Sequence, residues 1–287
     1  MDGPGSVNEL TIGRPVDAVR PFVAYYSGYR QAAVGSASHR GLPSPYLTLI
    51  FTLDEPLTVA QHPDPRQPAE RYVTLVGGLH TTPALVTHDG CQSGIQLALS
   101  PLGARAILGV PAGELAGIDV DGTDVLGPAA SRIQQRLQAA ASWPDRFAIL
   151  DELLRTEVLA GRPAVSAEVS YAWQRLLATG GAEPVAGLSQ QTGWSGRHLR
   201  DRFLTEIGLT PKAAARVVRF HRARQLLQRR ASTNGSLDLA GLAACCGYYD
   251  QAHLDREFRS LAGSAPTRWL AQEFRNIQAT PALADSG

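Results

Sequence analysis

A short pattern that occurs twice in the last third of the chain constrains its fold more than any other feature. The first copy runs from Gly193 to Pro211 and the second from Gly247 to Pro266, and a His-Leu pair, a Phe and a Gly recur in both at the same spacing. In each copy a glycine follows one short helical segment and precedes another, which is typical of a helix-turn-helix unit. The repeat therefore predicts two such units, and with them binding to double-stranded DNA.

The residues around each glycine predict where the helices end. Gly193 and Gly247 suit the left-handed backbone conformation that closes a helix. Ser195 and Asp250 then provide N-caps for the following helices. Apolar side chains four residues apart form one buried face in each second helix: Leu199 with Phe203, and Leu254 with Phe258.

The outward face of each second helix carries the candidate base readers. Arginine makes paired hydrogen bonds to guanine, glutamine does so to adenine, and alanine contacts the thymine methyl group. Asp201, Asp255 and Glu257 repel phosphate, so we expect them to contribute to specificity or to orient a neighbouring arginine. The predicted base-reading residues are Arg197, Arg200, Asp201, Gln251, Ala252, Asp255 and Arg256.

A long basic helix is predicted between the two units. Thr210 caps it, Pro211 suits its first position, and neither Gly nor Pro occurs from Lys212 to Arg230. Its arginines, Arg224 among them, are either solvated or in contact with phosphate, and the sequence leaves both readings open. The residues predicted to contact phosphate are Ser195, Lys212, Arg219, Arg222, Tyr249 and Arg259.

Residues 166–271 resemble the DNA-binding domain of AraC/XylS-type bacterial transcription regulators. The most specific part is the run Gly-Tyr-Tyr-Asp-Gln-Ala-His-Leu-Asp-Arg-Glu-Phe-Arg at 247–259. The resemblance implies an all-α domain over 166–275, with helix-turn-helix units at 183–206 and 238–261 that enter successive major grooves about 34 Å apart. It also implies a homodimer, with RNA polymerase as a partner if the protein is an activator. Ser189 stands where alanine is usual, and Gly196 weakens the start of the first recognition helix.

The charge distribution agrees with a DNA-binding C-terminal part. Residues 1–165 contain 12 basic and 16 acidic residues, a net charge of −4, whereas residues 166–287 contain 15 basic and 10 acidic residues, a net charge of +5. Basic charge confined to one domain is the electrostatic pattern expected of a nucleic-acid-binding protein.

The N-terminal part is predicted to be mostly β. Strand patterns at 46–53, 71–76, 84–87 and 94–99 favour a small barrel or sandwich, and helices are expected at 128–141 and 144–159. The fold class is therefore α+β, with a domain over 1–162 whose helices lie at 128–160, and a linker at 161–163. This part is similar to the cupin-like sensor domains of the same regulators, which implies a small-molecule effector. By their placement, His39, Arg40 and His80 are candidates to line its pocket. The alternative is a dimerisation or protein-interaction module without a ligand.

Other function classes find little support in the sequence. No Gly-x-Ser-x-Gly or phosphate-loop pattern occurs, so no enzyme and no catalytic residue are expected. His39, His62, His80 and His88 form no His-x-His pair, so neither a metal nor a cofactor is expected. No stretch of 18 apolar residues and no signal peptide are visible, and three cysteines suit a reducing compartment. We therefore expect a cytoplasmic regulator of transcription.

Overall fold

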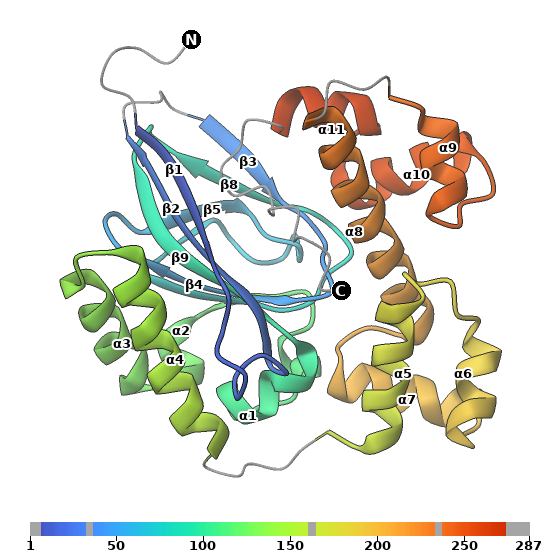
Figure 1. Cartoon of the computed structure of the whole chain (residues 1–287), viewed down its shortest axis with the longest axis horizontal. Coiled ribbons are helices and arrows are strands. Elements are labelled where there is room, and N and C mark those ends of the chain that lie inside the picture. Colours follow the sequence, from blue (N-terminus) through green and yellow to red (C-terminus); the bar gives the residue numbers. More distant parts are fainter. Residues whose placement is uncertain (1–6, 33–36, 160–164, 233–236, 274–287) are drawn as a thin grey trace.

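The chain folds into a β-rich N-terminal part and an all-helical C-terminal part that lie side by side (Figure 1). The structure is a computed structural model, and it describes residues 7–32, 37–159, 165–232 and 237–273. The α+β class predicted from the sequence is confirmed. The predicted linker at 161–163 lies outside the described residues.

Two antiparallel sheets face each other in the N-terminal part. The six-stranded sheet has the order β1 (Val7–Gly13), β2 (Val23–Ala32), β9 (Gln92–Leu99), β4 (Leu47–Thr52), β7 (Thr74–Gly77), β10 (Asp119–Asp121). The four-stranded sheet has the order β3 (Ala37–Gly41), β8 (Ala84–His88), β5 (Leu57–Gln61), β6 (Glu70–Tyr72). Because successive side chains of a strand point to opposite faces, β4 and β9 direct alternate side chains into the space between the sheets and toward the helices outside.

The sequence missed half of these strands. The segment predicted as one strand over 71–76 is divided at Val73, which is 47% exposed, so that β6 and β7 belong to different sheets. Strands β1, β2, β3, β5 and β10 were not predicted. Strand β2 is buried along most of its length and contains three tyrosines, so it lacks the alternation of apolar and polar residues that identifies a half-buried strand.

Helices cover the outer face of the six-stranded sheet. They are α1 (Ala104–Leu108), α2 (Gly122–Leu126), α3 (Pro128–Ala139) and α4 (Trp143–Leu159), and α3 and α4 are the two helices predicted from the sequence. Helix α4 lies close to β1 and β2 because glycines stand opposite its aromatic side chains. A Cβ atom at Gly13 would lie 2.5 Å from Phe147, and one at Gly28 would lie 2.5 Å from Trp143.

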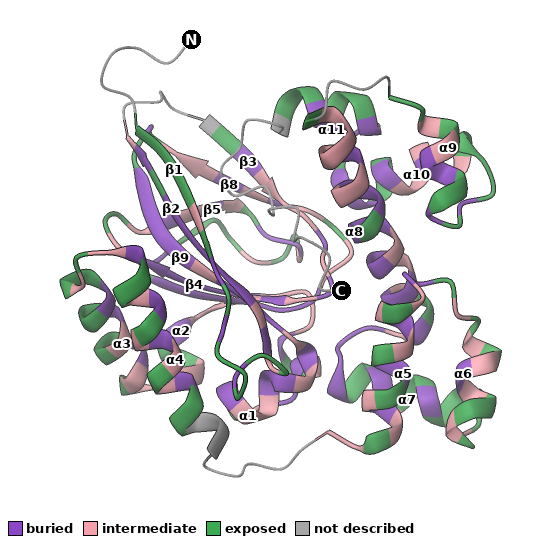
Figure 2. Cartoon of the chain, in the orientation of Figure 1, coloured by how far each residue is buried: buried purple, intermediate pink, exposed green. Residues whose placement is uncertain are grey.

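The C-terminal part consists of seven helices within the described residues. They are α5 (Ala167–Ala178), α6 (Val185–Thr192), α7 (Gly196–Glu206), α8 (Pro211–Ser232), α9 (Leu239–Cys245), α10 (Gln251–Ala262) and α11 (Pro266–Glu273). The long helix α8 contributes to both helix-turn-helix cores: Val217 packs with α5 and α7, and Phe220 packs with α10 and α11. Figure 2 shows that buried positions occur along the length of the helix.

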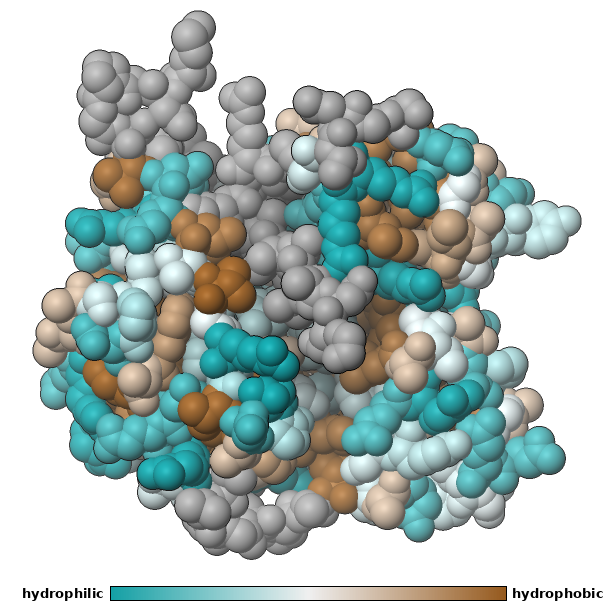
Figure 3. All heavy atoms as spheres, viewed as in Figure 1, coloured by the Kyte–Doolittle hydropathy of each residue, from teal (hydrophilic) through white to brown (hydrophobic). Residues whose placement is uncertain are grey.

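The surface is mixed in character. On the face shown in Figure 3, hydrophobic residues occur in small groups between hydrophilic ones. Among the exposed large hydrophobic residues, Val7, Leu10 and Ile12 lie on the edge strand β1. No described helix combines the length and the hydropathy that a membrane span requires.

Candidate nucleic-acid interface and sensor cavity

The local geometry of both helix-turn-helix units follows from the capping residues. Gly193 and Gly247 have φ angles of 70° and 73°, in the left-handed region that a side chain disfavours. Ser195 caps α7 by accepting a hydrogen bond from the backbone N–H of His198, and Asp250 caps α10 by accepting one from His253. The predicted turns and caps are therefore confirmed.

The recognition helices bury one face and expose the other. Leu199 and Phe203 of α7 and Leu254 and Phe258 of α10 are fully buried. Opposite them, the predicted base readers form an outward surface. Arg197, Arg200, Asp201, Gln251, Ala252 and Arg256 are exposed, and Asp255 is half-buried.

The acidic residues of these helices lie close to arginines. Glu257 of α10 accepts hydrogen bonds from Arg216 of α8, with both carboxylate oxygens within 3.2 Å of the guanidinium Nε. This places Glu257 in the second of its two predicted roles, as the partner of a neighbouring arginine. In α7, the carboxylate of Asp201 lies 4.0 Å from the guanidinium of Arg200 on the exposed surface.

The residues predicted to contact phosphate differ in their surroundings. Lys212, Arg222, Tyr249 and Arg259 are exposed, and Ser195 is exposed while its hydroxyl caps α7. Arg219 instead turns inward: its Nη2 donates to the carbonyl oxygen of Gly181 at 2.8 Å, and its guanidinium lies 5.7 Å from the centre of the Tyr248 ring.

The environment of Arg224 matches neither of the two alternatives considered for the arginines of α8, exposure to solvent or contact with phosphate. Arg224 is only 4% exposed and lies beside His221 on the face of α8 that is turned toward the β-rich part, so it is neither solvated nor placed for phosphate. Burial lowers its pKa to about 10. Burial and the nearby Arg224 also hold the pKa of His221 well below its ordinary value, so this imidazole is neutral.

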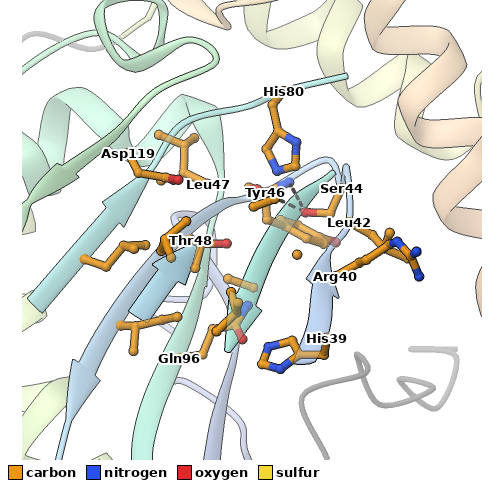
Figure 4. A pocket seen from close by; sticks show the side chains of 18 of the residues that line it. His39, Arg40, Leu42, Ser44, Tyr46, Leu47, Thr48, His80, Gln96 and Asp119 are labelled. Atoms are coloured by element: carbon orange, nitrogen blue, oxygen red, sulfur yellow. Dashed lines mark hydrogen bonds between the residues drawn. The ribbon is translucent and has the colours of Figure 1, made fainter. Parts of the chain in front are cut away.

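A cavity of about 100 Å³ opens between the two sheets and α8. His39, Arg40 and His80, which the sequence placed at a pocket mouth, all lie in its lining. Figure 4 shows His80 at one end and His39 and Gln96 at the other. We refer to this space as the barrel cavity.

Two residues of the helical part complete the barrel cavity. Arg224 of α8 and Trp269 of α11 belong to its lining. Trp269 is 1% exposed, and its indole N–H has no hydrogen-bond partner within the described residues. Around the cavity, Tyr46 packs edge-to-face on His221 at 5.8 Å, and Arg40 donates a hydrogen bond to Gln272. The barrel cavity therefore lies at the contact between the two parts.

A second contact joins the N-terminal part to the first recognition helix. Arg105 of α1 donates two hydrogen bonds to Glu206 at the end of α7, from Nε at 2.7 Å and from Nη2 at 3.1 Å. Arg202 donates a third at 3.0 Å, and the Glu206 side chain is 4% exposed. Beside this ion pair, the short 3-10 helix η2 (Ala112–Leu115) packs on α7 so closely that Gly113 has no room for a Cβ atom.

The histidines of the N-terminal part do not gather into a metal site. Within the described residues, no group of three or more His, Cys, Asp or Glu side chains is arranged to hold an ion. His62 instead pairs with Asp119 at 2.8 Å in a buried contact next to the Tyr72 ring.

Sequence reasoning missed the residues that act between the two parts. Arg105, Glu206, Arg224 and Trp269 belong to no motif, and their importance arises from how the domains pack. The sequence held one usable signal, which concerns Arg224. This arginine lies seven residues after Val217 and three before Leu227, so helical spacing places it on the same buried face of α8.

Comparison with known proteins assigns two regions of the chain. Residues 188–272 match a family model described as a helix-turn-helix domain, and residues 13–121 match one described as a domain of unknown function, DUF6597. No curated protein sequence matches the chain significantly.

Several solved structures match most of the chain at low sequence identity. The crystal structure of ToxT from Vibrio cholerae O395 is 9% identical, with a TM-score of 0.48, over 86% of this chain and 96% of that chain. Wild-type ToxT from V. cholerae strain SCE256 with bound unsaturated fatty acid is 8% identical, with a TM-score of 0.48, over 95% of this chain and 97% of that one. The AraC-like transcriptional activator CuxR is 15% identical, with a TM-score of 0.34, over 82% and 86%.

Proposed function

We propose that this chain, whose C-terminal part is the helix-turn-helix domain of an AraC/XylS-type transcription regulator, reads a specific DNA sequence under the control of a small molecule bound in its N-terminal part. The observation that carries the proposal is the pair of capped recognition helices. Helices α7 and α10 each bury an apolar face and expose arginine, glutamine or alanine on the other, and α8 joins them rigidly. That arrangement suits two successive major grooves.

In this proposal the exposed residues divide between two tasks. Arg197 and Arg200 read bases in the first groove, and Gln251 and Arg256 read bases in the second, with Asp201, Ala252 and Asp255 as the neighbouring specificity residues. Lys212, Arg222, Tyr249 and Arg259 hold the phosphate backbone, together with Ser195 at the start of α7. Arg219 joins this group only if it leaves Gly181 when DNA binds.

The effector is proposed to bind in the barrel cavity, where His39, Arg40 and His80 offer polar groups. Because Arg224 and Trp269 also line this space, a ligand there has a different affinity for the closed and opened arrangements of the two parts. Such a difference is what a ligand needs to shift an equilibrium between conformations. The closed cavity, at about 100 Å³, suits a small polar molecule.

Selection of genomic DNA fragments by the full-length protein tests the DNA-reading half of the proposal. The expected result is one motif with two short elements about one helical turn apart. Arg200→Ala should relax the preference at one base pair and cost about 1–3 kcal/mol there, whereas Arg222→Ala should weaken all sequences alike and reduce the salt dependence. Equal losses on every sequence for Arg200→Ala would make that residue a phosphate contact.

Thermal unfolding against a panel of metabolites tests the sensor half. A ligand that binds the folded protein raises the unfolding temperature by mass action, and His39→Ala should remove the shift. If no compound stabilises the protein while sedimentation shows a stable dimer, the N-terminal part acts as a dimerisation module.

A further inference from the structure

A second and larger cavity lies on the opposite side of the six-stranded sheet. It has a volume of about 750 Å³ and opens between the outer face of β4 and β9 and the helices α1, α3 and α4. Leu49, Phe51 and Leu97 form its floor, and each is at most 2% exposed. Since fully buried side chains line it, the space reaches the core and is not a shallow groove on the surface. We refer to it as the helix-side cavity.

The helix-side cavity has the size of a ligand site. Pockets that hold drug-sized molecules are about 300–1,000 Å³, and the helix-side cavity falls within that range. The walls of the helix-side cavity are aliphatic, with Ile107 and Leu108 from α1 and Leu150 and Leu154 from α4. An apolar body of roughly ten carbon atoms suits this lining, because its burial removes apolar surface from water on both sides.

Among the described residues that line the cavity, all the charged ones are arginines. Arg105, Arg132 and Arg136 contribute to it, and none of the described lining residues is Asp or Glu. Arg132 and Arg136 are exposed on α3, and Arg136 pairs with Glu152 of α4 at 2.7 Å. Three guanidinium groups beside an aliphatic chamber favour a ligand with one anionic group, because arginine binds carboxylate through paired hydrogen bonds.

We propose that the helix-side cavity binds a small amphipathic anion, and that this ligand competes with Glu206 for Arg105. The guanidinium of Arg105 holds the end of α7 through two hydrogen bonds to Glu206, while the same residue lines the cavity. An anion that takes this guanidinium leaves Glu206 buried with Arg202 alone. A buried carboxylate that loses a partner is strongly destabilised, so α7 separates from η2 and α1.

The two steps depend on the proposed function to different degrees. Binding of the anion depends only on the cavity and its arginines. Release of α7 becomes regulation of transcription only if α7 reads DNA, as proposed above. The measurements below therefore follow binding and α7 release without DNA, so that their failure is distinct from a failure of DNA recognition.

Calorimetric titration of the full-length protein with decanoate, below its micellar concentration, tests the binding step. We expect one site for decanoate. 1-Decanol, which lacks the carboxylate, and butanoate, which lacks the long apolar chain, should each bind at least about tenfold more weakly. Arg132→Gln should weaken decanoate but not decanol, and Ala129→Phe should block both, since Ala129 lines the cavity. Arg155→Gln, an exposed arginine of α4 outside the lining, is the matched control and should bind normally.

Three results would overturn the binding step. The first is no saturable binding of decanoate. The second is binding that survives Ala129→Phe and is lost in Gln96→Leu, which would place the ligand in the barrel cavity. The third is a change of oligomeric state in Ala129→Phe without any change in decanoate binding, which would identify the face as an interface between two copies of this chain.

Hydrogen exchange of the backbone amides of Leu204, Thr205 and Glu206 tests the competition. Decanoate should accelerate exchange there in the wild-type protein, and Arg105→Gln should show fast exchange without ligand. Exchange in α10, which Arg105 does not contact, should stay the same in both cases. If the protein is saturated with decanoate and the exchange rates in α7 do not change, the ligand does not compete with Glu206 for Arg105. That conclusion would hold even if the selected DNA motif matches the proposed function.

Discussion

Replacing Gly113 by alanine should separate the first recognition helix from the N-terminal part. A Cβ atom at this position would lie 2.3 Å from the carbonyl oxygens of both Leu204 and Thr205, whereas ordinary contacts begin at 3.4 Å. Both neighbours are backbone atoms, so no side-chain rotation relieves the overlap. Gly113 is also not among the glycines with a positive φ, so alanine fits its backbone and the overlap is the whole perturbation.

The magnitude follows from these distances. The difference between 3.4 Å and 2.3 Å requires η2 and α7 to move apart by about 1 Å. The same movement would lengthen the 2.7 Å hydrogen bond from Arg105 to Glu206 to about 3.8 Å, beyond hydrogen-bond range. Overpacking of this kind costs about 1–3 kcal/mol, which here destabilises the contact between the two parts and not the core of either.

Hydrogen exchange of α7 and fluorescence titration of a selected DNA fragment measure the outcome. Gly113→Ala should exchange faster at the end of α7, and its DNA affinity should become less dependent on effector. Glu114→Asp, an exposed substitution in the same turn that keeps the negative charge near Arg105, is the matched control and should behave as wild type. A Gly113→Ala protein with wild-type exchange at Leu204 and Thr205 would show that this interface does not hold α7, and the reasoning would fail.

Three further predictions concern stability. Asp250→Ala should lower the free energy of unfolding by about 1 kcal/mol through loss of the α10 cap, with Asp250→Asn nearly unchanged, as urea unfolding would show. By the same assay Leu254→Ala should cost about 2–5 kcal/mol, whereas exposed Arg256→Ala should change stability by less than about 0.5 kcal/mol while weakening DNA binding. Burial lowers the folded-state pKa of His221, and it also lowers those of His80 and His88, so the unfolded chain binds more protons and the free energy of unfolding should fall below about pH 6.5. His221→Phe should reduce this fall in thermal unfolding without abolishing it, and exposed His198→Phe should retain it in full.

The helical part was predictable in detail because its signals are local. The glycine and cap pairs at Gly193 and Ser195, and at Gly247 and Asp250, lie within a few residues of the helices they delimit. The spacing of Leu254 and Phe258 then determines which face is buried. Once the buried face of a recognition helix is known, the residues of its exposed face follow, so the candidate base readers could be predicted from the sequence. Their contacts with DNA stay a prediction.

The N-terminal part and the interdomain contacts were less accessible because they depend on distant residues. Strand β10 is three residues long and becomes a strand only by pairing with β7. Arg224 lies in an arginine-rich helix, where charge favours solvent, and only the docking of the N-terminal part on α8 buries it. Arg105 and Glu206 are 101 positions apart, and no local pattern connects them.

The length of α8 has a consequence for the DNA sites that this protein recognises. Its 22 residues form a continuous rod of about 33 Å, close to one turn of the double helix. A flexible tether would tolerate target elements at many separations, but a rod that is part of both cores does not. During evolution, an insertion of a few base pairs between the two elements of a target would therefore abolish its use, while base changes within one element would weaken it gradually. Promoters that this protein regulates should accordingly differ in base sequence but share the same separation between the two elements.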